Sequence, residues 1–250
     1  MRHFGVLFFA GFFLLAVMLE AQTSVPAKPV LVIFETELGK ITMEVDMVHA
    51  AITGENFLKY VDGKFYDGGI INRAVRPDNT TRHDVEIQVI QFQINPERNR
   101  DQFPPIPMEL TSVTGLKHVN GSLSMARSGP DTARASFSIP IGDQPKMDFG
   151  GKRNADGQGF AVFGRVVDGM DVVKRIHSSP TLSAGQRGAY GTETLEPPIG
   201  DVDTHRKMQS KKRVSTFESR HADNGISLKT SISCDRPDFW PDFCLNGNSL

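Results

Sequence analysis

The sequence contains little cysteine and tryptophan, and its cysteines are confined to one end. Of 250 residues, two are Cys and one is Trp. Cys234 and Cys244 have no His at a metal-ligand spacing, so neither a zinc centre nor a thiol nucleophile is predicted. In an oxidising compartment the two can form a disulfide, and otherwise they stay free thiols. The sequence leaves both states open.

An excess of charge of either sign is also missing. Lys and Arg total 28 against 29 Asp and Glu, which gives a formal net charge of −1. This balance provides no long-range attraction to nucleic acid or to an anionic membrane. We therefore expect no nucleic-acid partner.

Fingerprints of metal, nucleotide and nucleophile sites are absent as well. The stretch 152–157 resembles a calcium loop, but Lys152 occupies the first ligand position and Phe163 the closing one. No Rossmann fingerprint occurs. The scattered His49, His83, His118 and His177 show no Ser or Asp pattern of a catalytic triad, and we expect surface or capping positions for them. The sequence predicts no metal and no cofactor.

The first residues have the composition of an export signal. Arg2 and His3 precede an apolar run over residues 4–19, and Ala21 offers a cleavage site. The run is short for a membrane span, which needs about 20 apolar residues. We expect a signal peptide over 1–21, a linker over 22–29 and an exported protein, periplasmic or secreted, without stable membrane association after cleavage. An uncleaved membrane anchor is the alternative.

Short alternating runs, typical of half-buried strands, fill the middle of the chain. The alternation predicts strands over residues 30–36, 40–45, 66–75, 85–94, 121–126, 136–141 and 160–167. Helical periodicity is confined to 50–62, where Thr53 can cap the start, and to 170–177. Many short strands with two helices favour an antiparallel barrel or sandwich over alternating βαβ units.

The pattern weakens after residue 178. A strand could begin over 194–199, but Gly200 and Asp201 interrupt it, and residues 201–250 show no sustained period. We therefore expect the folded domain to span residues 30–199. Residues 200–250 are predicted to be a tail with little packed structure.

One cation lies inside an apolar strand. Residues 66–75 open with a Gly-containing turn and continue as an apolar run that encloses Arg73. A guanidinium is rarely buried without a partner, so this position needs a reason. Arg73 is either half of a structural ion pair at a sheet edge or a functional group.

Separated segments around Arg73 resemble the cyclophilin family of peptidyl-prolyl isomerases, in a bacterial-like form, over about 140 residues, roughly one domain. The matching segments are Ala50-Ala51-Ile52-Thr53 with Asn56-Phe57, Tyr66-Asp67-Gly68, Ile71-Asn72-Arg73-Ala74, the strand with Gln91, Ser124-Met125-Ala126-Arg127, Ser136-Phe137-Ser138-Ile139 and Phe160-Ala161-Val162-Phe163-Gly164. The resemblance implies a mainly β fold, a closed antiparallel eight-stranded barrel capped by two helices, with the substrate groove on its outer face.

The resemblance also implies a reaction, cis/trans rotation about Xaa-Pro bonds of exported polypeptides by a monomer that needs no cofactor. Arg73 takes the catalytic position, where a charged multi-donor group draws the prolyl nitrogen lone pair out of resonance. Gln91 holds the substrate backbone and places Arg73. The other implied substrate-binding residues are Val89, Ala126, Arg127, Ser138, Met147 and Phe160.

Two departures from the family pattern keep a second function open. Ser138 stands where the family has the Phe that floors the proline pocket, and Phe160 is expected to refill that space. Gln91-Phe92-Gln93-Ile94 replaces the family's Gln-Gly-Gly-Asp. The alternative is therefore a cyclophilin-like peptide-binding or chaperone module with weak or no catalysis.

Overall fold

The computed structural model describes residues 29–207. The predicted signal peptide, most of the linker, both cysteines and the tail beyond residue 207 lie outside the described residues. Within residues 29–207, no helix is both long and apolar enough to cross a bilayer.

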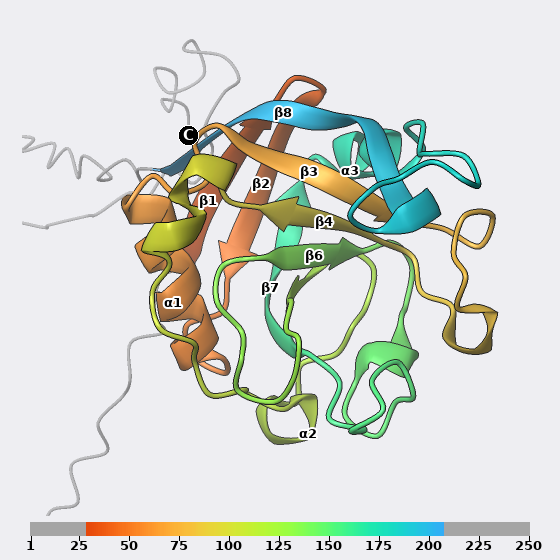
Figure 1. Cartoon of the computed structure of the whole chain (residues 1–250). Coiled ribbons are helices and arrows are strands. Elements are labelled where there is room, and N and C mark those ends of the chain that lie inside the picture. The colour runs from red at the N-terminus through yellow and green to blue at the C-terminus, as the bar shows by residue number, and fades with distance from the viewer. Residues whose placement is uncertain (1–28, 208–250) are drawn as a thin grey trace, which may run out of the picture. The chain divides into compact units, whose positions relative to one another are not determined.

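Eight antiparallel strands close into a barrel, as the resemblance implied (Figure 1). The strands are β1 (Val30–Thr36), β2 (Gly39–Val45), β3 (Gly69–Val75), β4 (Val89–Gln93), β5 (Ser122–Met125), β6 (Phe137–Pro140), β7 (Ala161–Asp168) and β8 (Thr194–Arg206). Their order around the barrel is β1-β2-β7-β5-β6-β4-β3-β8. The helices are α1 (Ala51–Asp62), α2 (Thr111–Thr114) and α3 (Met170–His177), and the 3₁₀ turns are η1 (His83–Val85), η2 (Pro96–Asp101), η3 (Pro145–Met147) and η4 (Gly191–Glu193).

Aromatic rings fill the barrel interior. The largest fully buried side chains include Phe34, Phe57, Tyr66, Phe92, Phe137 and Phe163. Phe92 of β4 and Phe137 of β6 are register partners, and their rings stack with centroids 4.6 Å apart. Phe34 of β1 meets both rings edge-on at 5.5 Å. Such contacts add specific geometry to the burial of a large apolar area, so this cluster dominates the core.

Helices α1 and α3 lie on opposite sides of the barrel (Figure 1). Phe57 of α1 enters the aromatic core and contacts Phe137 at 5.3 Å. The start of α1 is capped by a distant carboxylate: Glu109 accepts hydrogen bonds from the Thr53 backbone N–H at 2.8 Å and from the Thr53 hydroxyl at 2.6 Å. The prediction that Thr53 itself caps the helix is therefore wrong, because the donors at this end are satisfied by a tertiary contact.

The predicted end of the domain at residue 199 is also wrong. β8 continues through Gly200 to Arg206, pairing first with β3 and then, over Asp203–Arg206, with β1, which closes the barrel. Register shifts in the β3–β8 ladder accommodate a stretch that contains two prolines and a glycine. The apolar side chains of Leu195, Ile199 and Val202 are buried in the core.

The strand predicted over residues 85–94 is shorter in the structure. Val85 belongs to η1, and the strand begins at Val89. Val85 and Ile87 are buried, at 4% and 5% exposure, although neither belongs to a strand. The alternation of apolar and polar residues in this part of the sequence therefore reflects burial of the apolar side chains against the barrel, and it does not mark residues that pair in a sheet.

Candidate active site

A β-bulge directs Arg73 out of the barrel. The register of β3 shifts between Ile71 and Arg73 in both of its pairings, with β4 and with β8. Ile71 and Ala74 are fully buried, while Arg73 between them keeps 21% of its side chain exposed. A bulge re-aims a side chain without ending the strand, so an arginine can leave an otherwise apolar run.

The guanidinium of Arg73 is held by two partners. Nη1 donates to Gln91 Oε1 at 3.0 Å, and Nε and Nη2 donate to Glu193 Oε2 at 2.9 and 2.5 Å. The ring of Tyr190 lies 4.7 Å from the guanidinium carbon. A guanidinium has five N–H groups, so these three bonds leave one N–H on each Nη without a hydrogen bond among residues 29–207.

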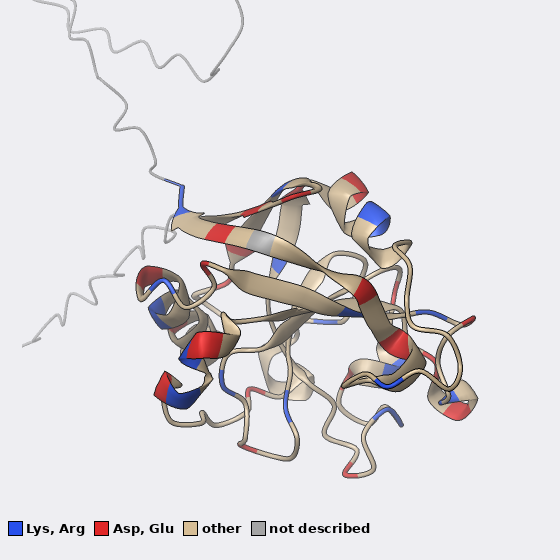
Figure 2. Cartoon of the chain, turned by 45° about the horizontal axis from the view of Figure 1, so that its top comes forward, with Lys and Arg blue, Asp and Glu red and all other residues tan. Residues whose placement is uncertain are grey.

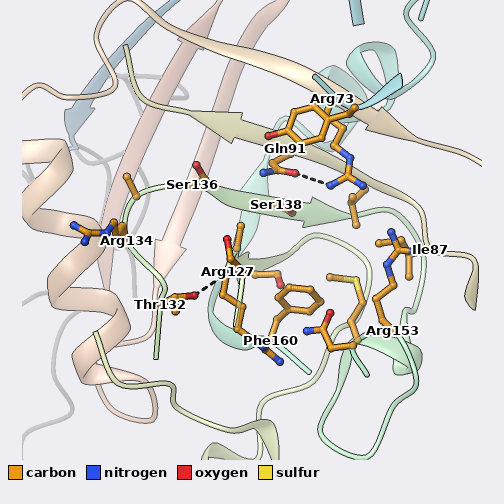
Figure 3. Close-up of a pocket in the computed structure, with 18 of the residues that line it drawn as sticks. Arg73, Ile87, Gln91, Arg127, Thr132, Arg134, Ser136, Ser138, Arg153 and Phe160 are labelled. Carbon is orange, nitrogen blue, oxygen red and sulfur yellow. Dashed lines mark hydrogen bonds between the residues drawn. The ribbon is translucent and has the colours of Figure 1, made fainter. Parts of the chain in front are cut away.

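The structure confirms the ion-pair interpretation of Arg73, and the functional interpretation stays a prediction. The arginine does form an ion pair, and it also lies on the wall of a cavity of about 470 Å³ beside Gln91 and Ser138 (Figure 3). The ion pair fixes the guanidinium, and it leaves donors available at the wall.

Glu193 was not predicted from the sequence. It lies in η4, where it is 7% exposed, and its second oxygen accepts a hydrogen bond from Thr80 Oγ1 at 2.8 Å. The pairing of Thr194 with Arg73 across β8 and β3 brings this carboxylate to the site. No local pattern marks Glu193, because the two partners are 120 residues apart and only closure of the barrel joins them.

Gln91 and Ser138 form the adjoining wall of the cavity. They are register partners across β4 and β6, and both are buried, at 8% and 7% exposure. Ala126, directly after β5, lies on the same cavity, and its N–H donates to the Ser136 carbonyl at 2.9 Å. The structure thus brings Arg73, Gln91, Ala126 and Ser138 together, as the resemblance implied.

The apolar part of the cavity is a small cluster outside the barrel. Val89 and Met147 are buried together with Val75 and Ile87, and Phe160 packs against them. Val89, Met147 and Phe160 all line the cavity, so this surface supplies an apolar floor, although Ser138 stands where the resemblance implies a Phe.

Arg127 lines the cavity, but its charge is turned toward a neighbouring loop. Nη1 and Nη2 form a bidentate pair with Asp156 at 2.7 and 2.8 Å, and Nε donates to the Gly159 carbonyl at 2.8 Å. The hydrogen bonds from Arg127 lower the pKa of Asp156 to about 2. The guanidinium carbon lies 5.4 Å from the centre of the Phe160 ring, so Arg127 holds that ring in place.

His118 and His177 are buried, so the expected surface or capping positions are wrong for these two. His118 Nδ1 lies 2.7 Å from Asp148 Oδ1, and Nε2 lies 2.9 Å from Ser124 Oγ. Burial alone would raise the pKa of Asp148, but the hydrogen bonds from His118 outweigh it and the pKa is lowered. Ser124 is 1% exposed within β5. This Ser-His-Asp array therefore ties the loop after η3 to the barrel and presents no accessible nucleophile.

Positive side chains surround the cavity. The lining includes Arg73, Arg82, Arg127, Arg134 and Arg153, and no Asp or Glu belongs to it among the described residues. Arg73 and Arg127 were predicted from the sequence as site residues, and the other three arginines were not. Since the net charge of the chain is −1, composition gave no sign of this concentration.

The arrangement has the parts for acting on a peptide bond without covalent chemistry. A fixed cation faces an open cavity beside an amide side chain and an apolar floor. Among residues 29–207, no three His, Cys, Asp or Glu side chains gather as a metal site. The N–H groups of Arg73 that have no partner here can donate charge-assisted hydrogen bonds to a bound substrate.

Comparisons with known proteins agree with this geometry. A family model described as "Cyclophilin type peptidyl-prolyl cis-trans isomerase/CLD" matches residues 31–193. The peptidyl-prolyl cis-trans isomerase of Acinetobacter baylyi is 34% identical over 152 residues, covering 60% of this chain and 73% of that protein. Peptidyl-prolyl cis-trans isomerase B of Escherichia coli is 33% identical over 156 residues, covering 62% and 88%.

A solved structure shows the same fold. The crystal structure of a cyclophilin type peptidyl-prolyl cis-trans isomerase from Cryptosporidium parvum aligns with a TM-score of 0.56 at 17% identity, over 72% of this chain and 99% of that one. With the family match over residues 31–193, the chain belongs to the cyclophilin-type peptidyl-prolyl cis-trans isomerase family.

Proposed function

We propose that this domain is a peptidyl-prolyl cis-trans isomerase that accelerates rotation about Xaa-Pro bonds, with Arg73 as its catalytic residue. The planar peptide bond has a barrier of about 18–20 kcal/mol because resonance stiffens the C–N bond. The observation that carries the proposal is the guanidinium of Arg73, fixed by Gln91 and Glu193 on the wall of an open cavity.

Arg73 acts on the twisted state of the bond more than on the planar one. As the bond rotates, the prolyl nitrogen regains a lone pair that can accept a hydrogen bond. The N–H groups of Arg73 that are not engaged by Gln91 or Glu193 can donate to it. A preorganised donor that becomes effective in the transition state lowers the barrier without a nucleophile.

The other predicted residues take supporting roles in this proposal. Gln91 holds Arg73 and the substrate backbone, while Val89, Met147 and Phe160 receive the proline ring. Ala126, Arg127 and Ser138 line the path of the substrate chain. We propose that the natural substrates are proline-containing segments of exported polypeptides, since the first 21 residues have the composition of a signal peptide.

A second candidate function is peptide binding with weak catalysis, and Ser138 favours it. A serine offers less apolar surface to a proline ring than the phenylalanine of the family. Burying a large apolar side chain is worth about 1.5–3 kcal/mol, so the loss weakens proline binding.

A peptide assay with two matched variants tests the proposal. We expect the full-length protein to accelerate isomerisation of an Ala-Pro tetrapeptide, and Arg73→Ala to lower kcat/KM by about 10²–10³, the cost of removing one preorganised donor. Arg165→Ala is the control, because Arg165 is an exposed arginine on β7 that pairs with Glu44 at 3.4 Å and does not line the cavity. Equal rates for the wild type and Arg73→Ala would remove the catalytic role, and binding without turnover would support the second function.

A further inference from the structure

Three arginines meet where two cavities adjoin. The cavity of about 470 Å³ that contains Gln91 and a neighbouring one of about 400 Å³ share Arg73, Arg82 and Arg153 in their linings. Arg82 and Arg153 belong to loops that enclose the far side of the site. In Figure 3 the side chains of Arg73 and Arg153 lie on the same side of the pocket and extend toward one another.

Arg153 carries a buried charge without a carboxylate. The residue is 8% exposed, and its Nη1 donates to the Val85 carbonyl at 3.1 Å. No Asp or Glu lies within ion-pair distance of it among the described residues. By contrast, the other two members of the cluster have counter-charges, Glu193 for Arg73 and Asp84 for Arg82. A buried charge needs compensation, and no paired carboxylate within residues 29–207 supplies it for Arg153.

The surroundings of Arg153 increase this excess of positive charge. Burial lowers the pKa of Arg153, and the charges of Arg73 and Arg82 lower it further, while Glu193 and Asp84 oppose the shift without cancelling it. The Arg82–Asp84 pair is exposed, so its contribution is screened by solvent. An anion placed between Arg82 and Arg153 would supply the missing counter-charge.

The loop holds Arg153 in this position. Its backbone N–H donates to the Lys146 carbonyl at 3.0 Å, and its own carbonyl accepts a hydrogen bond from Arg82 Nη1 at 3.3 Å. The two arginines are thus connected through the backbone, and the charged end of Arg153 is presented to the cavity by ordered structure.

We propose that Arg153 and Arg82 form an oxyanion subsite that selects proline-containing peptides with an anionic side chain close to the isomerised bond. The subsite adjoins Arg73, so its ligand is a carboxylate of Asp or Glu, or a phosphate on Ser or Thr, carried by the same peptide. Guanidinium groups match the geometry of both oxyanions. This inference rests on the proposed isomerase function and names its preferred substrates.

A peptide is a better fit than an extended polyanion. The arginines line cavities, and Figure 2 shows acidic and basic residues interspersed along the chain and not separated onto one face. Nucleic acids and anionic membranes favour a continuous basic surface, which a net charge of −1 does not suggest.

The test compares matched peptides on the full-length protein. We expect kcat/KM for a Glu-Pro peptide to exceed that for the matched Gln-Pro peptide by about tenfold, the effect of one hydrogen bond to a charged group. A phosphoserine-Pro peptide should exceed its Ser-Pro partner by more, because it carries about two charges. A second pair with the acidic residue after proline identifies the side on which the subsite lies. Equal values within every pair would overturn the proposal.

Variants connect the preference to the proposed residues. In Arg153→Gln the ratio of kcat/KM for the Glu-Pro peptide to kcat/KM for the Gln-Pro peptide should fall to about 1. In Arg82→Gln this ratio should fall by about half, because Arg82 is exposed and its charge is screened by solvent. Arg165→Gln should keep the wild-type ratio. If Arg153→Gln does not fold, Arg82→Gln decides, and an unchanged ratio in that variant contradicts the subsite.

Activity and preference are read out separately. Turnover of an Ala-Pro peptide reports on the isomerase function alone. If no peptide is turned over, the isomerase function fails, and fluorescence anisotropy with labelled Glu-Pro and Gln-Pro peptides then decides on the subsite. Tighter binding of the Glu-Pro peptide that depends on Arg153 supports it, and equal binding overturns it. The preference should also weaken as salt increases, since a partly exposed charge interaction is screened.

Discussion

The interior of the barrel and the groove on its outside are built by the same strands and have opposite chemistry. In β4, Gln91 faces the groove and Phe92 the core; in β6, Phe137 faces the core and Ser138 the groove. The inner partners stack their rings at 4.6 Å, while the outer partners are polar and lie beside Arg73. Because strand side chains alternate, this pair of strands contributes to the core on one face and to the wall of the proposed site on the other. Stability and the proposed chemistry should therefore respond to different residues one position apart.

The largest expected effect is on the core. Phe137→Ala removes a ring from the centre of the aromatic cluster and should lower the free energy of unfolding by about 3–5 kcal/mol. Ser138→Ala, the next residue on the strand, should change it by less than about 1 kcal/mol, since the residue lies outside the core. Denaturant unfolding measures both. If both variants lost a similar free energy of unfolding, the interior and the groove would not differ in their contribution to stability.

A smaller effect is expected from the carboxylate that holds Arg73. Glu193→Gln keeps the shape of the side chain but leaves the guanidinium without its counter-charge. Glu193 is a positioning residue, so Glu193→Gln should lower kcat by about tenfold and leave KM nearly unchanged. The reason is that a displaced donor loses about 1–2 kcal/mol of transition-state stabilisation.

Steady-state kinetics on an Ala-Pro peptide separate these constants. A change in KM alone would mean that Glu193 acts on substrate binding and not on the placement of Arg73. The control is Glu44→Gln, which removes the exposed partner of Arg165 away from the groove.

Placing an aromatic side chain in the groove should strengthen the binding of proline, whereas the preceding variants weaken stability or catalysis. Ser138→Phe adds apolar surface beside the Val89, Met147 and Phe160 cluster. We expect KM for a neutral proline peptide to fall by about fivefold, a part of the value of burying such a side chain. An unchanged KM, with unfolding unaffected, would show that Phe160 already provides the proline surface.

The smallest effect concerns the pH dependence of stability. Burial lowers the pKa of His177, whose Nε2 lies 2.8 Å from the Val75 carbonyl; nearby Arg76 lowers it further, while that hydrogen bond and Asp78 oppose the shift. A His with a lowered pKa takes up protons more readily in the unfolded chain. Stability should therefore fall as pH decreases below 6.5, the ordinary pKa of His. In His177→Gln the free energy of unfolding should decrease less as the pH falls. Denaturant unfolding between about pH 7.5 and about pH 5, the range over which His titrates, measures this difference.

Much of the barrel was predictable because buried and exposed residues alternate along its strands, and this alternation is visible in the sequence. Ile41, Met43 and Val45 alternate with polar residues, and all three face the core. The same rule failed at Val85 and Ile87, which are buried but belong to no strand, and at β8, where Pro and Gly obscured a strand that bulges make possible. Local patterns describe burial well, and they describe ladder pairing less well.

Some residues of the candidate site could likewise be predicted from the sequence, and others could not. Arg73 stood out as a cation within an apolar run, and Gln91 followed from the resemblance, so both could be found in the sequence. Glu193 and Arg153 could not, since each reaches the groove from a loop far along the chain. The sequence by itself determined the alternation that builds the barrel and the residues at the centre of the groove. Tertiary structure alone decided which charges surround them, because only a closed barrel brings residues 73, 153 and 193 to one place.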